Sequence, residues 1–124
     1  GSSNALIEGV VTYSNQSKIS RLGVREDTLS KYGAVSSQTA EEMVKGILKT
    51  TGADIGLAVT GIAGPGGGTP EKSVGLVYIG IGNKSGDIKV NRYNLLGNRR
   101  RVQGTAASIA LDLVRRMLLG LEIR

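Results

Sequence analysis

The apolar positions of the chain follow two different spacings, and each spacing predicts a different kind of element. Val, Ile and Leu dominate four short segments, which is typical of β-strands. The predicted strands are Ala5–Tyr13, Asp54–Thr60, Val74–Ile81 and Ile88–Leu95. Asp54–Thr60 and Val74–Ile81 are so densely apolar that we expect both faces of each strand to be buried. Ile88–Leu95 alternates apolar with polar residues, which places it nearer an edge of the sheet.

Helical spacing separates these strands and follows the last of them. Residues 14–23 and 25–33 predict two short helices, each ending at a glycine. Residues 36–52 predict a longer helix, whose apolar face is formed by Ala40, Met43, Val44, Ile47 and Leu48. Asn98–Leu119 predicts one long helix with an apolar stripe of Val102, Ala106, Ile109, Leu113 and Met117. The chain is therefore expected to carry a helix on either side of a set of largely buried strands.

The order of these elements predicts an α/β fold, a three-layer α/β/α sandwich with a mixed β-sheet. Strands that alternate with helices place helices on both faces of a sheet. Val74–Ile81 and Ile88–Leu95 are too close in sequence for a helical crossover, so this pair must be an antiparallel hairpin. At 124 residues, we expect the chain to form a single domain, residues 1–124.

Composition limits the chemistry that is available. The chain contains no Cys and no His, which excludes disulfides, thiolate metal sites and the commonest general base. Any catalysis must use Ser, Thr, Tyr, Lys, Arg, Asp or Glu. No apolar run approaches the length of a membrane span, and no N-terminal stretch has the pattern of a secretion signal. We expect a cytoplasmic protein that needs no metal or cofactor.

The net charge of +6 is compatible with an ordinary basic surface, with nucleic acid or with an anionic small molecule. A polynucleotide site would require basic residues interleaved with aromatic ones, or a known module, and the sequence shows neither. Arg99, Arg100 and Arg101 form the one dense basic cluster, at the start of the last predicted helix, where cations oppose the helix dipole. A bound phosphate would account for that placement, and a solvated helix end is the alternative.

Gly61–Gly75, which we call the glycine loop, follows the carboxyl end of a predicted buried strand. Six of its residues are glycine, and Pro65 and Pro70 stiffen it. Ligands of α/β sheets bind outside the carboxyl ends of strands, and glycine lets backbone N–H groups approach an anion closely. The loop is therefore a candidate anion site, to which Thr60 adds a hydroxyl. A flexible connection between two strands is the alternative, and the loop matches neither a Walker A motif nor a dinucleotide fingerprint.

Tyr13 and Lys18 lie at the end of a predicted strand and in the first turn of the next helix. A lysine acts as a general base only where burial or neighbouring cations lower its pKa. Spacing alone does not distinguish Lys18 from a solvated surface lysine. Ser2 and Ser3, near the N-terminus, carry no signal by themselves.

Four segments together resemble the CinA C-terminal domain family in order and spacing, and the resemblance covers almost the whole chain. They are GVVTYSNQSKISRLGV, YGAVSSQTAEEM, ADIGLAVTGIAGPGGGTPEKSVGLVYIG and NRRRVQGTAASIALDLVRRML. The most specific part is AVTGIAGPGGGTPEKSVG. The resemblance implies a bacterial nicotinamide-nucleotide amidase, which hydrolyses nicotinamide mononucleotide (NMN) to nicotinic acid mononucleotide and ammonia in pyridine-nucleotide salvage. It also implies a homodimer with the three-layer fold.

The resemblance assigns catalytic roles to residues near the N-terminus. Ser3 matches the family's nucleophile, Lys18 its general base and Tyr13 the tyrosine placed beside that pair. Ser2 in place of Ser3 stays open as the nucleophile. A Ser–Lys pair is a known way to activate a serine without histidine, which agrees with the composition.

The resemblance also assigns substrate-binding residues. The positions that match the family's ligand-binding loop are Thr60, Gly61, Ala63 and Gly64. Arg100, with Arg99 beside it, matches an arginine that reaches the nucleotide, and the choice among Arg99, Arg100 and Arg101 stays open. Loop amides and arginines would hold the substrate phosphate, and their positive field would help keep Lys18 neutral.

The sequence departs from the family pattern at its N-terminus. The family carries a further strand and a Ser-Cys-Thr-Gly-Gly segment upstream, and that strand is expected inside the sheet. We therefore expect residues 1–124 to be an N-terminally truncated CinA C-terminal-like amidase domain, completed by a separate N-terminal fragment of the same protein or by another chain. The alternatives are a non-catalytic binding module related to competence or DNA damage, and a decayed domain that keeps only the fold. Loss of catalysis on substitution of Lys18 would separate the first reading from these two.

Overall fold

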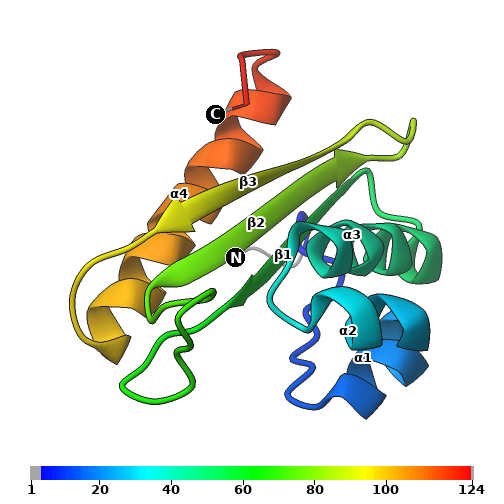
Figure 1. Ribbon diagram of the computed structural model, residues 1–124. Coiled ribbons are helices and arrows are strands. Elements are labelled where there is room, and N and C mark those ends of the chain that lie inside the picture. Colours follow the sequence, from blue (N-terminus) through cyan, green and yellow to red (C-terminus); the bar gives the residue numbers. More distant parts are fainter. Residues whose placement is uncertain (1–3, 124) are drawn as a thin grey trace.

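The computed structural model describes residues 4–123, in which helices cover both faces of a β-sheet (Figure 1). The helices are α1 (Asn15–Leu22), α2 (Glu26–Tyr32), α3 (Ser37–Thr51) and α4 (Arg99–Leu118). The strands are β1 (Ile55–Gly61), β2 (Leu76–Asn83) and β3 (Ile88–Asn94). α3 packs on one face of the sheet with α1 and α2 beside it, and α4 packs across β1 and β2 on the other face. The predicted three-layer α/β/α arrangement is confirmed.

The described sheet has the strand order β1-β2-β3, with β2 in the centre. Leu57 pairs with Ile81 in the β1–β2 ladder, and Ile79 pairs with Asn91 in the β2–β3 ladder. Both pairings are antiparallel, so the predicted hairpin of β2 and β3 is confirmed. The described sheet is antiparallel throughout, whereas the sequence predicted a mixed sheet. A parallel pairing would need a strand in addition to these three.

The predicted strand Ala5–Tyr13 was wrong for the residues that the structure describes. This segment has no ladder to β1, because a cleft separates residues 8–13 from β1. Both figures show the segment before α1 on the β1 side of the sheet. Strand-type residues cannot form a strand without a neighbour to accept their backbone hydrogen bonds. For the same reason β1 is an edge of the described sheet, and Val59 is 42% exposed instead of buried on both faces.

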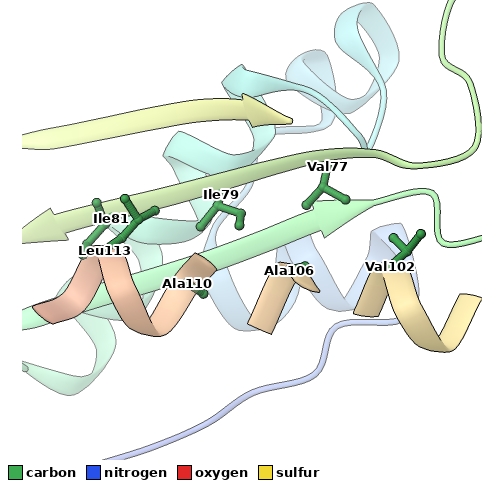
Figure 2. Close-up of a cluster of buried hydrophobic side chains, with 7 residues drawn as sticks. All are labelled: Val77, Ile79, Ile81, Val102, Ala106, Ala110 and Leu113. Atoms are coloured by element: carbon green, nitrogen blue, oxygen red, sulfur yellow. The ribbon is translucent and has the colours of Figure 1, made fainter. Parts of the chain in front are cut away.

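The core on the α4 side of the sheet is aliphatic (Figure 2). The apolar stripe of α4 faces the side chains of β2 that point away from α3. This cluster consists of Val77, Ile79, Ile81, Val102, Ala106, Ala110 and Leu113. Burial of each large side chain in such a cluster contributes about 1.5 to 3 kcal/mol. The predicted stripe on α4 is thereby confirmed, with Ile109 and Met117 at its partly buried margin.

The core on the other face connects α1, α2 and α3 to β1. Its buried members are Leu22, Val24, Leu29, Met43, Val44 and Ala58. α1 crosses α3 at a very close approach, because a Cβ built on Gly46 would lie 1.8 Å from the carbonyl oxygen of Leu22. Only a glycine in α3 permits this crossing. The depth at which α1 sits against the sheet is therefore set at Gly46.

The helix ends follow from capping residues in the sequence. The side chains of Ser14, Ser36 and Asn98 accept hydrogen bonds from backbone N–H groups in the first turns of α1, α3 and α4. α1 and α3 end at Gly23 and Gly52, both in the left-handed conformation that glycine adopts without a steric penalty. The Ser14 cap fixes where α1 begins, and so fixes the position of Lys18 one turn later.

Candidate functional site

A cleft of about 410 Å³ opens between residues 8–13, β1 and the inner faces of α1 and α3. Three residues that the sequence singled out line it together. They are Tyr13, Lys18 and Thr60. Glu8 also lines the cleft, and Met43 and Ile47 of α3 contribute apolar surface. The cleft therefore combines apolar walls with a few polar groups, which is the usual make-up of a small-molecule site.

Lys18 is the buried charged residue of the cleft. It lies on the inward face of α1 together with Leu22, and its side chain is only 7% exposed. Its Nζ donates a hydrogen bond to the carbonyl oxygen of Thr12 at 2.8 Å. Burial lowers the pKa of Lys18 below its ordinary value of 10.5, because the charged form loses hydration. A larger neutral fraction near neutral pH is the condition for a lysine general base.

Tyr13 precedes the N-cap of α1 and lies at the mouth of the cleft. Its side chain is 91% exposed. Because Tyr13 and Lys18 are joined through the first turn of α1, the cap at Ser14 sets their relative placement. The phenol is therefore accessible to a ligand that enters from solvent, as the predicted role beside the lysine requires.

Thr60 lies near the end of β1, where the glycine loop begins. Its side chain is 8% exposed, and its hydroxyl donates to the carbonyl oxygen of Ala34 at 2.8 Å. A hydroxyl has one proton to donate, so Thr60 can serve a ligand only as an acceptor while this bond is kept. Thr60 therefore also ties the start of the glycine loop to the α2–α3 connection.

The first half of the glycine loop is closely packed, and its tip is not. A Cβ on Gly61 would lie 2.9 Å from the carbonyl oxygen of Leu76, and a Cβ on Gly64 would lie 2.5 Å from Cγ1 of Val74. Gly64 is buried, has a positive φ of 82° and precedes a cis peptide bond to Pro65. Residues 65–71 are exposed. The predicted binding residues Gly61, Ala63 and Gly64 thus lie in the closely packed half of the loop.

The arginine cluster reaches the glycine loop from the N-terminus of α4. Nη1 of Arg99 donates to the carbonyl oxygen of Gly64 at 3.2 Å. Arg100 is exposed, and the side chain of Arg101 lies against Gly97. Among the described residues, Arg99 is the member of the cluster whose side chain bonds the loop. The structure thus connects Arg99 with Gly64, whereas contact of Arg100 with a substrate stays a prediction.

The predicted nucleophile Ser3, and Ser2 as its alternative, lie outside the described residues. Their roles stay predictions. No group of three candidate metal ligands occurs within residues 4–123. In the same part of the chain, no helix has the length and hydropathy needed to cross a membrane.

Sequence reasoning missed the contacts that hold the glycine loop from outside. Nζ of Lys72 donates to the carbonyl oxygen of Tyr32, at the end of α2. Glu8 was likewise missed as a carboxylate on the cleft. Neither residue is part of a recognisable sequence motif for these contacts. Each lies beside residues that are distant in the sequence, and only the fold brings them together.

Comparisons with known proteins agree with this arrangement. The family model of the CinA C-terminal domain matches residues 1–118 of this chain. The chain is 54% identical over 121 residues to a CinA-like protein of Kosmotoga olearia, and 55% identical over 119 residues to a putative competence-damage inducible protein of Clostridium novyi. These matches cover 98% and 96% of this chain, and 29% and 28% of the two relatives. The chain therefore spans less than a third of the length of these relatives.

Solved structures give the same result. The competence damage-inducible protein A of Klebsiella pneumoniae superposes with a TM-score of 0.86 at 36% identity, over 92% of this chain and 70% of that one. The competence/damage inducible protein of Agrobacterium tumefaciens superposes with a TM-score of 0.82 at 40% identity, over 84% of this chain and 64% of that one. At these identities the likeness agrees with the family match as well as with the fold.

Proposed function

The chain belongs to the CinA C-terminal domain family, and on that basis we propose that it is an amidohydrolase that acts on NMN. The observation that carries the proposal is Lys18, a buried lysine with a lowered pKa on a cleft that it shares with Tyr13 and Thr60. Structural lysines are seldom buried without a carboxylate partner, whereas the described bond of Lys18 is to the carbonyl oxygen of Thr12. A perturbed ionisable group in a cleft marks a functional site.

In the proposed reaction, neutral Lys18 accepts the proton of the Ser3 hydroxyl while the serine oxygen attacks the carboxamide carbon. The tetrahedral oxyanion is stabilised by backbone N–H groups. The proton passes through Tyr13 to the amine, the C–N bond breaks, and ammonia leaves an acyl-enzyme. Water then attacks the ester carbon and Lys18 accepts its proton. As the ester C–O bond breaks, Lys18 returns that proton to the oxygen of Ser3, and nicotinic acid mononucleotide leaves.

The position of the glycine loop supports a phosphate-bearing substrate. Ala63 and Gly64 lie where the loop leaves β1, and the guanidinium of Arg99 lies against Gly64. Arg100 and Arg101 add positive charge at the start of α4. A phosphate held there would offset the unfavourable placement of three cations at a helix N-terminus. The nicotinamide ring would then extend toward the cleft and Lys18.

We also propose that a further strand, from a separate N-terminal fragment of the same protein, pairs with the open edge of β1. Two observations support this proposal. β1 has no charged side chain, although it lies at an edge of the described sheet, and its Val59 is 42% exposed. Intact mass spectrometry of the purified protein, first native and then denaturing, tests this proposal. We expect a second polypeptide that is retained under native conditions, and a single 12.9 kDa species in both would reject it.

Ammonia release from NMN tests the amidase proposal. We expect release by the wild-type protein, loss of release in Lys18→Met, and wild-type release in Lys89→Met, an exposed lysine on β3. Circular dichroism of the three proteins controls for folding. Equal release by wild type and Lys18→Met would reject the mechanism. If the wild-type protein, together with any retained fragment, releases no ammonia, the non-catalytic binding module becomes the better account.

A further inference from the structure

The glycine loop is attached to the rest of the protein at both of its ends through one short segment, Tyr32–Ala34. The hydroxyl of Thr60, just before the loop, donates to the carbonyl oxygen of Ala34 at 2.8 Å. Nζ of Lys72, near the end of the loop, donates to the carbonyl oxygen of Tyr32. The two acceptors lie two residues apart. The loop that connects β1 to β2 is thus hydrogen-bonded, near both of its ends, to one segment between α2 and α3.

The acceptor segment is itself held rigidly. The carbonyl oxygen of Gly33, between the two acceptors, receives the hydroxyls of Ser36 at 3.0 Å and Thr39 at 2.7 Å. Both hydroxyl residues are buried, and Thr39 is 0% exposed. Three successive carbonyls are therefore engaged by side chains. Because the bonds to Gly33 come from the start of α3 and not from the loop, the segment can support the loop.

The chemistry of the Lys72 contact suits a cation. The carbonyl of Tyr32 lies at the C-terminus of α2, where the last carbonyls lack helical partners and the dipole is negative. Gly33 leaves space for the ammonium, because a Cβ at that position would lie 3.0 Å from Nζ of Lys72. Arg99 of α4 bonds the loop at a second point, the carbonyl oxygen of Gly64. Two cationic side chains thus fasten the loop through carbonyl oxygens, since Lys72 of the loop bonds Tyr32 of α2 and Arg99 of α4 bonds Gly64 of the loop.

The loop has few other contacts that could fix its tip. The N–H of Thr69 donates to the carbonyl of Lys72 at 2.8 Å, and the N–H of Lys72 donates to the Thr69 hydroxyl at 3.0 Å. These two bonds close a turn within the tip and do not connect it to the rest of the chain. A Cβ built on Gly66 would have no contact within 4 Å among the described residues. In the described part of the chain, Lys72 is therefore the residue that joins this turn to a helix.

We propose that Lys72 is a positioning residue that fastens the tip of the glycine loop to the end of α2 and so holds the loop ready for the substrate phosphate. The inference rests on the proposed nucleotide site in this loop. Lys72 acts through the backbone of the loop and not by contact with the reacting atoms. Its loss should weaken substrate binding and leave the chemical step at Lys18 largely unchanged.

Amide hydrogen exchange tests the fastening in the free protein, without any substrate. The variant is Lys72→Met, which keeps the length of the stem and removes the ammonium. We expect exchange at the N–H groups of Thr69 and Gly75 to become about tenfold faster, since one charge-assisted hydrogen bond is lost. Lys49→Met, an exposed lysine of α3, is the matched control and should leave both rates unchanged. Unchanged exchange in Lys72→Met would overturn the proposal.

Kinetics with NMN test the consequence for the site. We expect the KM of Lys72→Met to rise about five- to tenfold while kcat stays within a factor of two, and Lys72→Arg to restore most of the KM. Faster exchange with an unchanged KM would reject the positioning role. If the wild-type protein releases no ammonia, the amidase proposal fails by itself. Hydrogen exchange then still decides whether Lys72 fastens the loop.

Discussion

β1 and β3 both lie at an edge of the described sheet, yet their side chains differ in kind. β3 alternates partly buried residues with exposed polar ones, among them Lys89 and Arg92. Charged side chains on an edge strand discourage pairing with other chains. β1 has no charged residue from Ile55 to Gly61, and Val59 is exposed on it. β3 is therefore built as an edge, whereas β1 has the composition of an interior strand.

The two edges also differ in what lies beside them. The cleft with Lys18, Tyr13 and Thr60 adjoins β1, and the glycine loop leaves from its end. β3 does not line the cleft, and its end meets the loop at the last loop residue, where the N–H of Leu95 donates to the carbonyl oxygen of Gly75. The comparison teaches that the apolar character of β1 and the candidate chemistry belong to one side of the molecule. Each of the following changes tests whether that asymmetry is real.

The largest effect is expected from paired lysine substitutions at the two edges. Lys18→Met removes the proposed general base and should lower kcat/KM for NMN by roughly 10³-fold or more. Lys89→Met removes a charge from β3 and should leave kcat/KM within a factor of two. Ammonia release measured at several NMN concentrations gives both values. A similar loss in the two variants would show that Lys18, the lysine of the cleft, has no special role.

Core substitutions compare the centre of the sheet with its β1 edge. Ile79→Ala leaves a cavity beneath α4, where Ile79 is fully buried, and should lower the free energy of unfolding by about 2 to 5 kcal/mol. Val59→Ala removes a partly exposed side chain and should cost less than about 1 kcal/mol. Urea unfolding followed by circular dichroism measures both. A large loss for Val59→Ala would mean that the β1 edge is covered in solution.

The pH dependence of activity should carry the signature of a buried lysine. Lys18 must be neutral to accept a proton, and burial lowers its pKa below 10.5. We expect kcat/KM to rise about tenfold per pH unit below that lowered pKa and then to level off before pH 10.5. Stability should rise with pH between the lowered pKa and 10.5, because in that window the unfolded chain holds more protons at Lys18 than the folded one. Glu8 and Tyr13 are the other ionisable groups on the cleft. A flat profile over this range would exclude Lys18 as the base.

Smaller losses of stability than that of Ile79→Ala are expected from the N-caps of the two long helices. Ser36→Ala removes the cap of α3 at Thr39 N–H and the bond to the Gly33 carbonyl, and should cost about 2 kcal/mol. Asn98→Ala removes the exposed cap of α4 and should cost about 1 kcal/mol. Thermal unfolding ranks the two. The reverse order would show that the support of the glycine loop contributes little to stability.

Most of the fold could be predicted from sequence because local signals agreed with one another. Periodicity placed α3 and α4, and caps such as Ser36 and Gly52 placed their ends. The error at Ala5–Tyr13 has a physical cause, because side-chain pattern reports strand propensity and not the presence of a partner strand. The position of β1 at an edge was missed for the same reason.

The candidate site was only partly accessible to sequence reasoning. The resemblance to the family identified Lys18, Tyr13 and Thr60, which the fold brings to one cleft. It did not identify Lys72, whose acceptor Tyr32 lies forty residues earlier in the chain. Contacts of a side chain with a distant backbone carbonyl leave no trace in residue type or spacing. They appear only when the tertiary structure is known.

The crossing at Gly46 gives the site a hidden dependence on a residue that touches no substrate. One added methyl group there would meet the Leu22 carbonyl at 1.8 Å and push α1 outward. Lys18 is part of α1 and would move with it. Displacement of a catalytic group by about 1 Å can lower the rate by about 10²-fold. A larger residue at position 46 would therefore lower activity as an active-site substitution does, although residue 46 only packs one helix against another. A screen for inactive variants should recover substitutions at this position.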